Sequence, residues 1–437
     1  MKLIINYLTR RHGLNNLQAG EKQTFRLHLG YTLLDNFVAG VLTLNEFVFL
    51  KSLHGSSYQL SFLFQFSVLV FIFLIFISEW LKRMNDKPKL IRITGLLTRA
   101  PLAILLFFPR STGVIEANPL YHYVFLGLFL IYYLGNPVIF PTINLFLKNN
   151  YRHEHFGKLY SLATVYGKVL MLVTAFAYGM LLDYDKNSYT YVFALAAVAG
   201  VVSTYLLSKI QYVGEKTEPA GNSFWQNVKT SALGMRRIMK ENVPFRHFEL
   251  GFLFYGFAFM STVTVMTLFF ERQLGLNYFS VATYKNSYNI IALFLIPFFG
   301  RTLGKIDPRK FAAVTFASIM LYLLSLVLTA YLPQHIQLGN FKLFYSMIPF
   351  VLFHAVFAAT MSLLWNIGSA YFCKPHEAGE YQSVHLFLTA TRAVFAPLLG
   401  VLFYELFGFV FTFSLGAASL FIAILIMIWS YRRDRAY

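Results

Sequence analysis

Three charged side chains stand inside long apolar runs of this sequence: Asp35, Lys168 and Arg392. If each run is a helix, a rise of 1.5 Å per residue places the three charges about 13–16 Å from the helix starts, at a common depth. Ionisable groups in apolar surroundings are costly and usually face a charged partner or a polar cavity. Their residue types therefore indicate two kinds of chemistry, proton exchange at the carboxylate and anion binding at the cations.

Proton exchange is the role that we predict for Asp35. Glu46 follows at a spacing close to three full turns, so an uninterrupted helix would carry both carboxylates on one face. His354 stands in another apolar run and could also bind a proton at physiological pH. The alternatives are a permanent ion pair between Asp35 and Lys168, and an interfacial position for Glu46. For His354 the alternative is a hydrogen bond to a neighbouring group.

Anion binding is the role predicted for Lys168 and Arg392. Their positions differ by nearly the offset at which the chain repeats, so each half would supply one cation to a shared anionic or zwitterionic substrate. A guanidinium fork suits carboxylate and phosphate geometry. The alternative is that each cation neutralises a carboxylate or binds helix carbonyl groups. Polar and aromatic side chains in the same runs complete the predicted substrate contacts: Asn136, Tyr132, Trp365 and Asn366.

The overall composition requires a membrane to explain it. Of 437 residues, 57% are hydrophobic and 13% are charged, and the mean hydropathy is +0.56. A soluble domain carries about 25% charged residues, so this chain lacks the polar surface that a water-soluble globule needs. We therefore predict an all-α polytopic membrane protein. This class excludes secreted proteins, cytosolic enzymes and nucleic-acid-binding proteins.

The sequence contains no motif for catalysis or for a cofactor. Gly-x-Ser-x-Gly, His-Glu-x-x-His and the phosphate-binding P-loop are missing, so we predict neither an enzyme nor an ATP-driven pump of the P-loop type. The single Cys373 rules out an internal disulfide or a multi-cysteine metal site. We expect no cofactor and no metal. The expected partners are a small-molecule substrate, protons and the lipid bilayer, for a monomeric chain that binds no nucleic acid.

Apolar stretches long enough to cross a bilayer, at about 20 residues each, fall into two sets of six. The first set lies near residues 25–50, 59–79, 93–108, 121–147, 157–182 and 189–209. The second set lies near residues 248–270, 280–299, 311–331, 344–365, 383–405 and 407–430. Between them, residues 225–240 combine apolar and basic side chains and predict a helix on the membrane surface.

These stretches predict five segments of the chain. They are an N-terminal segment 1–24, a six-helix half 25–210, a linker 211–247, a second half 248–430 and a tail 431–437. Most of the 37 Lys and Arg residues fall in loops on the side of the N-terminus. Cytoplasmic loops carry such an excess, so we predict both termini in the cytoplasm and the chain in the cell membrane. Arg99 and His385 lie close enough to predicted helix ends for their side chains to reach that surface.

The two halves repeat at an offset of about 221 residues. Asp86 and Lys89 correspond to Asp307 and Lys310, and similar matches occur in three other loops. The matched loops are also basic: Glu79-Trp-Leu-Lys-Arg-Met-Asn-Asp-Lys-Pro-Lys89 and Gly300-Arg-Thr-Leu-Gly-Lys-Ile-Asp-Pro-Arg-Lys310. In these loops the chain resembles the major facilitator superfamily, over about residues 25–430. The resemblance implies twelve transmembrane helices in two pseudo-symmetric halves that transport a solute by alternating access.

Both loops depart from the family pattern, because Arg83 and Gly304 occupy the positions where the family usually has Asp. An acid stands three positions later in each loop. We predict that a conformational latch uses these acids and nearby charges: Asp86, Lys89, Asp307, Arg309, Lys310, Glu154, Glu377 and Glu380. The alternative is that the acids are solvated, since exposed ion pairs often contribute little.

The sequence thus predicts a secondary active transporter of a small organic solute, with proton-coupled symport as the leading mechanism. A second possibility is a proton-driven exporter of drugs or metabolites. The stretch Ser161–Tyr184 lacks the Gly-Pro pair of antiporters, although Ala396-Pro397 followed by Gly400 partly resembles it. A third is a membrane receptor or assembly partner that uses the same fold without transport.

Overall fold

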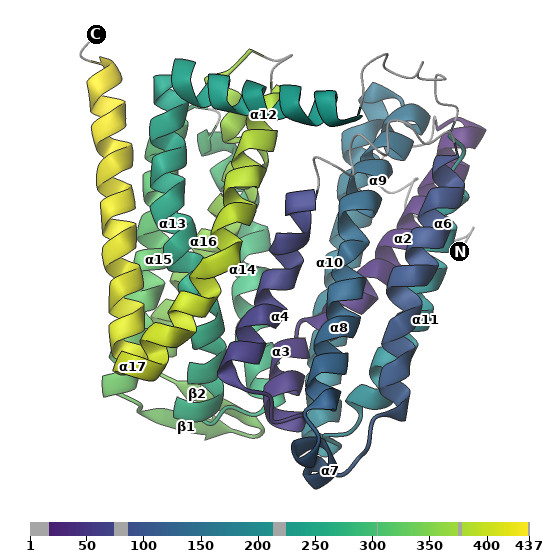
Figure 1. The fold of residues 1–437 in the computed structure, drawn as a ribbon, viewed down its shortest axis with the longest axis vertical. Coiled ribbons are helices and arrows are strands. Elements are labelled where there is room, and N and C mark those ends of the chain that lie inside the picture. Colours follow the sequence, from purple (N-terminus) through teal and green to yellow (C-terminus); the bar gives the residue numbers. More distant parts are fainter. Residues whose placement is uncertain (1–16, 74–85, 213–223, 304, 375–377, 436–437) are drawn as a thin grey trace. The chain divides into compact units, whose positions relative to one another are not determined.

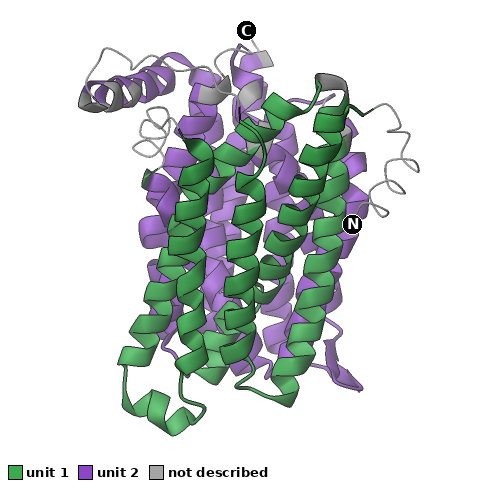
Figure 2. Cartoon of the chain, turned by 90° about the vertical axis from the view of Figure 1, so that its right-hand side faces the viewer, with its two compact units in different colours: residues 1–54, 73–224 green, residues 55–72, 225–437 purple. Residues whose placement is uncertain are grey.

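The computed structural model describes residues 17–73, 86–212, 224–303, 305–374 and 378–435. These residues are mostly helical (Figure 1) and form two compact units, coloured separately in Figure 2. Unit 1 comprises residues 1–54 and 73–224, and unit 2 comprises residues 55–72 and 225–437. The chain thus passes from one unit to the other inside the predicted linker, but residues 55–72 belong to unit 2.

Among the described residues, nine helical stretches are long and apolar enough to cross a membrane. The longest of them, residues 380–434, has 55 residues, more than twice the roughly 20 that one crossing needs. It is interrupted at Gly408, where φ is 81° and ψ is −179°, a conformation that favours glycine. The predicted helical membrane class is confirmed, whereas twelve spans in two six-helix halves stay a prediction.

Unit 1 is built around the first long helix, α2, which packs against α10 and α11. Gly40 of α2 allows the close approach, because a Cβ there would lie 2.6 Å from the carbonyl oxygen of Met171 on α10. The elements of this unit are α2 (Ala19–Leu42), α3 (Asn45–Phe47), the π-helical turn η1 (Val48–Ser52), α6 (Lys87–Arg99), the 3-10 segment η3 (Ala100–Phe107), α7 (Thr112–Ala117), α8 (Leu120–Leu134), α9 (Asn136–Asn150), α10 (His153–Tyr184) and α11 (Tyr189–Ser208).

Unit 2 repeats this type of contact between α13 and the long helix α17. Gly400 of α17 packs directly on the backbone of Ser261 in α13, where a Cβ would lie 1.9 Å from the carbonyl oxygen. The elements are α4 (Ser57–Leu69), the 3-10 turn η2 (Val70–Phe73), α12 (Phe224–Glu241), α13 (Val243–Leu268), η4 (Phe269–Gln273), α14 (Tyr278–Leu303), α15 (Pro308–Tyr331), β1 (His335–Leu338), β2 (Phe341–Phe344), α16 (Met347–Ile367), η5 (Ser369–Phe372) and α17 (Ala378–Arg435).

The repeated loop acids begin equivalent helices in the two units. The Asp86 carboxylate accepts a 2.8 Å hydrogen bond from the backbone N–H of Lys89 and caps α6. Asp307 caps α15 in the same way, through the N–H of Arg309 at 2.8 Å. A proline follows each acid within the first turn, where its missing N–H is not needed. The sequence repeat therefore corresponds to a repeated helix start.

Two elements lie at opposite ends of unit 2 (Figure 1). Helix α12 runs crosswise to α13 at the end where the C-terminus lies, and it spans the residues for which a linker helix was predicted. Its place in a cytoplasmic linker on the membrane surface stays a prediction. At the other end, β1 and β2 form a short antiparallel hairpin that we did not predict. Its turn places Gly339 at φ 59°, and a Gly-Asn pair between two short apolar runs is a known hairpin signal.

Candidate functional site

A buried arginine, Arg99, organises the polar interior of unit 1. Only 2% of the residue is exposed. Its Nη1 donates to the carbonyl oxygen of Tyr132 at 2.7 Å and its Nη2 to Oδ1 of Asn136 at 3.1 Å. Its guanidinium carbon also lies 3.8 Å from the centre of the Tyr132 ring. Helices α6, α8 and α9 therefore fix this cation, and Gly200 of α11 leaves room for its side chain.

Asp35 is close enough to this arginine to interact with its charge, but the two side chains form no ion pair. The positive charge of Arg99 interacts electrostatically with the Asp35 carboxyl, and the Tyr31 hydroxyl group donates a hydrogen bond to it. Asp35 is partly exposed. The alternative ion pair between Asp35 and Lys168 is not formed. Lys168 is partly exposed on α10 and makes no hydrogen bond or ion pair with any residue that the structure describes. The cation beside the acid is the one that we had expected at the membrane surface.

The extent of α6 explains why that expectation for Arg99 was wrong. The apolar stretch was predicted to start near residue 93, whereas the candidate span runs from Lys87 to Phe107. Arg99 is therefore about 18 Å from the start of the span. The basic residues in the first turns of α6 concealed this start, because they lower the local hydropathy.

Glu46 does not continue the helical face of Asp35. Helix α2 ends at Leu42, a turn follows, and Glu46 belongs to the short helix α3 before the π-helical segment η1. The prediction that both carboxylates share one helix face is wrong, because the helix is not continuous between Asp35 and Glu46. Glu46 is partly exposed, and its charge interacts electrostatically with Tyr133.

In unit 2, a buried carboxylate and a histidine form a pair that the sequence did not reveal. Nδ1 of His385 lies 2.8 Å from Oε1 of Glu249, and the two side chains are 2% and 1% exposed. The rings of Trp365 and Phe252 each lie 4.8 Å from the His385 ring. Glu249 Oε2 and His385 Nε2 have no hydrogen-bond partner among the described residues. The expected surface position of His385 is wrong, because α13 begins at Val243 and covers this part of α17.

Arg392 lies farther along α17 and is also only 2% exposed. Its Nη2 donates to Oγ1 of Thr389 at 2.5 Å. Its Nε and Nη1 are buried without a partner in the part of the chain that is described. The negative charge of Glu249 interacts electrostatically with this guanidinium group. Gly256 of α13 leaves space for the Arg392 side chain. Arg392 is therefore a buried cation with unused donors.

His354 of α16 lies between two tyrosine rings. The ring centres of Tyr288 and Tyr322 are 3.7 and 4.7 Å from that of His354, nearly parallel to it. Its Nδ1 is buried and has no partner within the described ranges. Lys285 is the charged group that acts on it. His354 is thus packed between two tyrosine rings, and its role in proton exchange stays a prediction.

The predicted latch residues of unit 2 tie α15 to the end of α17. Arg309 forms ion pairs with Asp307 and with Asp434, and it donates to the Ser430 carbonyl oxygen at 3.1 Å. Burial opposes ionisation of Asp307, but the hydrogen bonds from Arg309 hold the pKa of that carboxyl below its ordinary value. The Lys310 ammonium lies 4.2 Å from the centre of the Tyr431 ring.

The remaining latch candidates have fewer described contacts. Glu380 and Lys89 are exposed. Glu377, and the side chains of Glu154 and Asn366, lie outside what the structure describes. Close to Glu154 in the sequence, His155 and Arg152 bind the buried Glu21 of α2, at 3.1 Å and 3.3 Å. Nothing in the sequence indicated that Glu21 pairs with His155 and Arg152.

The described residues include no group of three or more His, Cys, Asp or Glu side chains that could hold a metal ion. The two polar clusters described above contribute two arginines, two carboxylates and a histidine, on apolar helices.

A sequence model of the Major Facilitator Superfamily matches residues 27–393 of this chain. The chain belongs to the Major Facilitator Superfamily. The resemblance in the two basic loops is thereby confirmed. No curated protein matches the sequence.

Solved structures of transporters share the fold of this superfamily member. The nucleoside transporter NupG is 10% identical, with a TM-score of 0.67 over 94% of this chain and 100% of its own. A peptide transporter POT is 14% identical, with a TM-score of 0.68 over 94% and 95% of the two chains. A bacterial homologue of the human drug peptide transporters is 14% identical, with a TM-score of 0.64 over 95% and 99%. Identities this low establish the fold alone.

The family establishes a transporter of the facilitator type, and its membrane-spanning helices carry both polar clusters. Asp35, Arg99, Tyr132 and Asn136 form the cluster of unit 1. Glu249, His385, Thr389 and Arg392 form the cluster of unit 2. Of the residues predicted from sequence, the structure brings Tyr132 and Asn136 to Arg99, and Trp365 to His385.

Proposed function

We propose that this protein is a proton-coupled secondary transporter of a small anionic or zwitterionic organic solute, working by alternating access. The observation that carries the proposal is the incomplete hydrogen bonding of Arg392. Two of its donors are buried without a partner among the described residues, which is costly unless a ligand or water satisfies them. A solute carboxylate or phosphate would supply acceptors in the planar geometry that a guanidinium prefers.

Lys168 is the second cation of the proposed substrate contacts. It lies on a different unit from Arg392 and has no bond to any described residue. Trp365 and Asn366 stay candidates for the same contacts. Asn136 and Tyr132 instead position Arg99, since their oxygens accept its hydrogen bonds.

Asp35 is the proposed proton carrier. Its carboxyl is partly exposed, and the buried Arg99 beside it supplies a fixed positive charge when the acid is ionised. A carboxylate that exchanges a proton needs both access and an environment that tolerates each charge state. Glu46 stays a secondary candidate because it is also partly exposed.

The setting of the proposal is a cell membrane with both termini in the cytoplasm and a monomeric chain. The charges that cap and tie α6 and α15 would act as the latch at the cytoplasmic ends. The fold neighbours include transporters of nucleosides and of peptides. Nucleosides and peptides are both small polar solutes, and this supports a solute of that size here.

Reconstitution into liposomes tests the proposal. We expect an inward proton gradient to drive accumulation of at least one organic acid or dipeptide from a panel that also contains nucleosides as neutral solutes. The Asp35→Asn variant should lose this accumulation and retain exchange of labelled solute across the membrane. Glu116→Gln, which removes an exposed acid of α7, is the matched control and should accumulate normally.

Two outcomes would replace the proposal by an alternative. Proton efflux exchanged for amphipathic compounds would indicate an exporter. Absence of flux for the whole panel, from a protein that is folded in the liposome, would indicate a receptor or assembly partner. Full accumulation by Asp35→Asn would remove Asp35 from the mechanism.

A further inference from the structure

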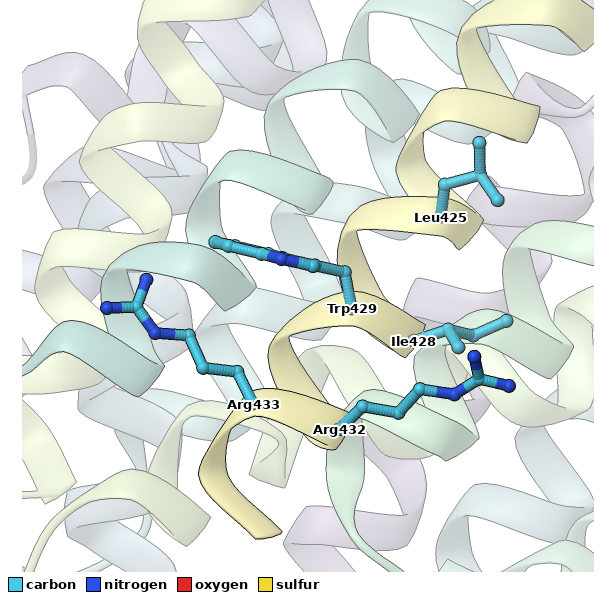
Figure 3. Close-up of a pocket in the computed structure, with 5 residues that line it drawn as sticks. All are labelled: Leu425, Ile428, Trp429, Arg432 and Arg433. Carbon is cyan, nitrogen blue, oxygen red and sulfur yellow. The ribbon is translucent and has the colours of Figure 1, made fainter. Parts of the chain in front are cut away.

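The last turns of α17 carry a groove, which Figure 3 shows with its lining residues. The groove has a volume of about 490 Å³. Its lining residues recur at helical spacing: Leu425, Ile428, Trp429, Arg432 and Arg433. Leu425 and Trp429 are each 50% exposed. The opposite face of the same helix is buried, with Met427 and Ser430 at 0% exposure. An apolar helix face of this kind in a membrane-spanning helix contacts lipid.

The two arginines change the chemistry of this face at its end. In Figure 3, Arg432 extends on the side of Ile428 and Leu425, and Arg433 on the side of Trp429. The Arg433 guanidinium carbon lies 5.6 Å from the centre of the Trp429 ring. Tryptophan and arginine at the end of an apolar helix mark the level of the lipid headgroups. The groove therefore reaches from the headgroup level toward the acyl chains.

The positive charge at this level is not neutralised by any residue that the structure describes. Neither Arg432 nor Arg433 forms an ion pair with a described residue. The acid that follows them, Asp434, is held by Arg309, which also binds Asp307. This leaves two guanidinium groups above an apolar groove, with the nearest carboxylate in the sequence already committed.

We propose that this groove binds an anionic phospholipid. The Arg432 guanidinium would hold the headgroup phosphate, and an acyl chain would lie along Ile428 and Leu425. Arg433 would add attraction from beside Trp429. A zwitterionic lipid offers the same acyl chain but no net charge, so the site selects by headgroup. This inference requires only that the helix lies in a bilayer, so it does not depend on what the protein transports.

Fluorescence quenching of Trp429 tests the site directly. The protein has four tryptophans, and replacing Trp80, Trp225 and Trp365 by Phe leaves Trp429 as the reporter. In mixed vesicles, we expect brominated phosphatidylglycerol to quench Trp429 at about fivefold lower mole fraction than brominated phosphatidylcholine does. Arg432→Ala should remove most of this preference, and Arg433→Ala a smaller part.

Arg236→Ala is the matched control, because it removes an exposed arginine from α12 and leaves the groove intact. It should keep the preference for phosphatidylglycerol. Equal quenching by both lipids would overturn the proposal and leave an ordinary lipid-facing helix. The same holds if Arg236→Ala and Arg432→Ala reduce the preference equally, because the effect would then be one of overall charge. Native mass spectrometry of the unaltered chain, counting bound phosphatidylglycerol against phosphatidylcholine, gives the same comparison without the tryptophan replacements.

Discussion

Arg99 of unit 1 and Arg392 of unit 2 are both buried among apolar helices, and the two arginines differ in how fully their donors are used. Arg99 of unit 1 donates to two acceptors and stacks on Tyr132, and only its Nε lacks a partner among the described residues. Arg392 of unit 2 donates to Thr389 alone and leaves Nε and Nη1 unpartnered there. Burial is the same for both, at 2% exposure. The difference lies in what their neighbours provide.

The acids near the two arginines differ in how exposed they are. Asp35 beside Arg99 is partly exposed, whereas Glu249 near Arg392 is 2% exposed and bound to His385. Unit 1 thus has a fixed cation and an accessible acid, and unit 2 has a fixed acid and a cation with spare donors. An accessible acid suits proton exchange, and a cation with spare donors suits anion binding. In the proposed function, the accessible acid of unit 1 carries the proton and the cation of unit 2 binds the anion.

The largest expected effect concerns stability. Arg99→Met leaves the Tyr132 carbonyl and Asn136 without their charged donor, and should lower the free energy of unfolding by about 3 kcal/mol. Arg392→Met removes a poorly satisfied buried charge, and should change it by less than about 1 kcal/mol. Chemical unfolding of the two variants in the same detergent measures both. Equal losses would break the comparison between the two arginines.

Substrate binding should depend on Arg392 more than on Arg99, the reverse of the order expected for stability. Arg392→Lys keeps the charge but loses the planar fork, and we expect solute binding to weaken by about 1–2 kcal/mol. Calorimetric titration of the purified variant with the transported solute measures this. Lys168→Ala in the Asp35→Asn background is the companion experiment. If that double variant binds the solute as Asp35→Asn does, Lys168 is not a substrate contact.

The Glu249 charge should oppose the binding of an anion at Arg392. Glu249→Gln keeps a hydrogen-bonding side chain next to His385 and removes the negative charge that acts on Arg392. We expect an anionic solute to bind about threefold to tenfold more tightly, because the guanidinium charge is no longer offset. Asp35→Asn should leave the affinity for the solute nearly unchanged. Weaker binding by Glu249→Gln would show that Glu249 itself contacts the solute.

The smallest expected effect separates the two repeated helix caps. Asp307 binds Arg309 as well as its cap N–H, and its pKa is below the ordinary value, whereas Asp86 caps α6 through a backbone N–H. Substitution of either acid by Asn should cost about 1 kcal/mol or less, since Asn also caps helices.

The pH dependence distinguishes the two positions. A carboxyl with a lowered pKa in the folded state stabilises the fold above its unfolded value, near 3.8 for Asp, and this contribution is lost as the pH falls through the folded value. The difference in thermal midpoint between wild type and Asp307→Asn should therefore be present at neutral pH and shrink in acid. A difference that is independent of pH would show that the ion pair with Arg309 adds nothing to the cap.

The amino-acid sequence by itself determined the membrane class, the apolar stretches and the repeated helix starts. Each of these depends on neighbours along the chain. Hydropathy needs only about 20 consecutive residues, and the Asp86 and Asp307 caps act on N–H groups two or three positions away. The crosswise helix α12 was equally local, because its apolar and basic residues lie within one segment.

Only the tertiary structure decided which charges meet. Asp35 lies near Arg99 rather than Lys168, because α6 starts earlier than its hydropathy indicated and carries Arg99 into the interior. Glu249 and His385 are 136 positions apart and pair because α13 packs on α17, where Gly400 and Gly256 permit close contact. Helical periodicity states which residues of one helix share a face. Which neighbouring helix covers that face depends on the packing of many side chains at once, and no local pattern records it.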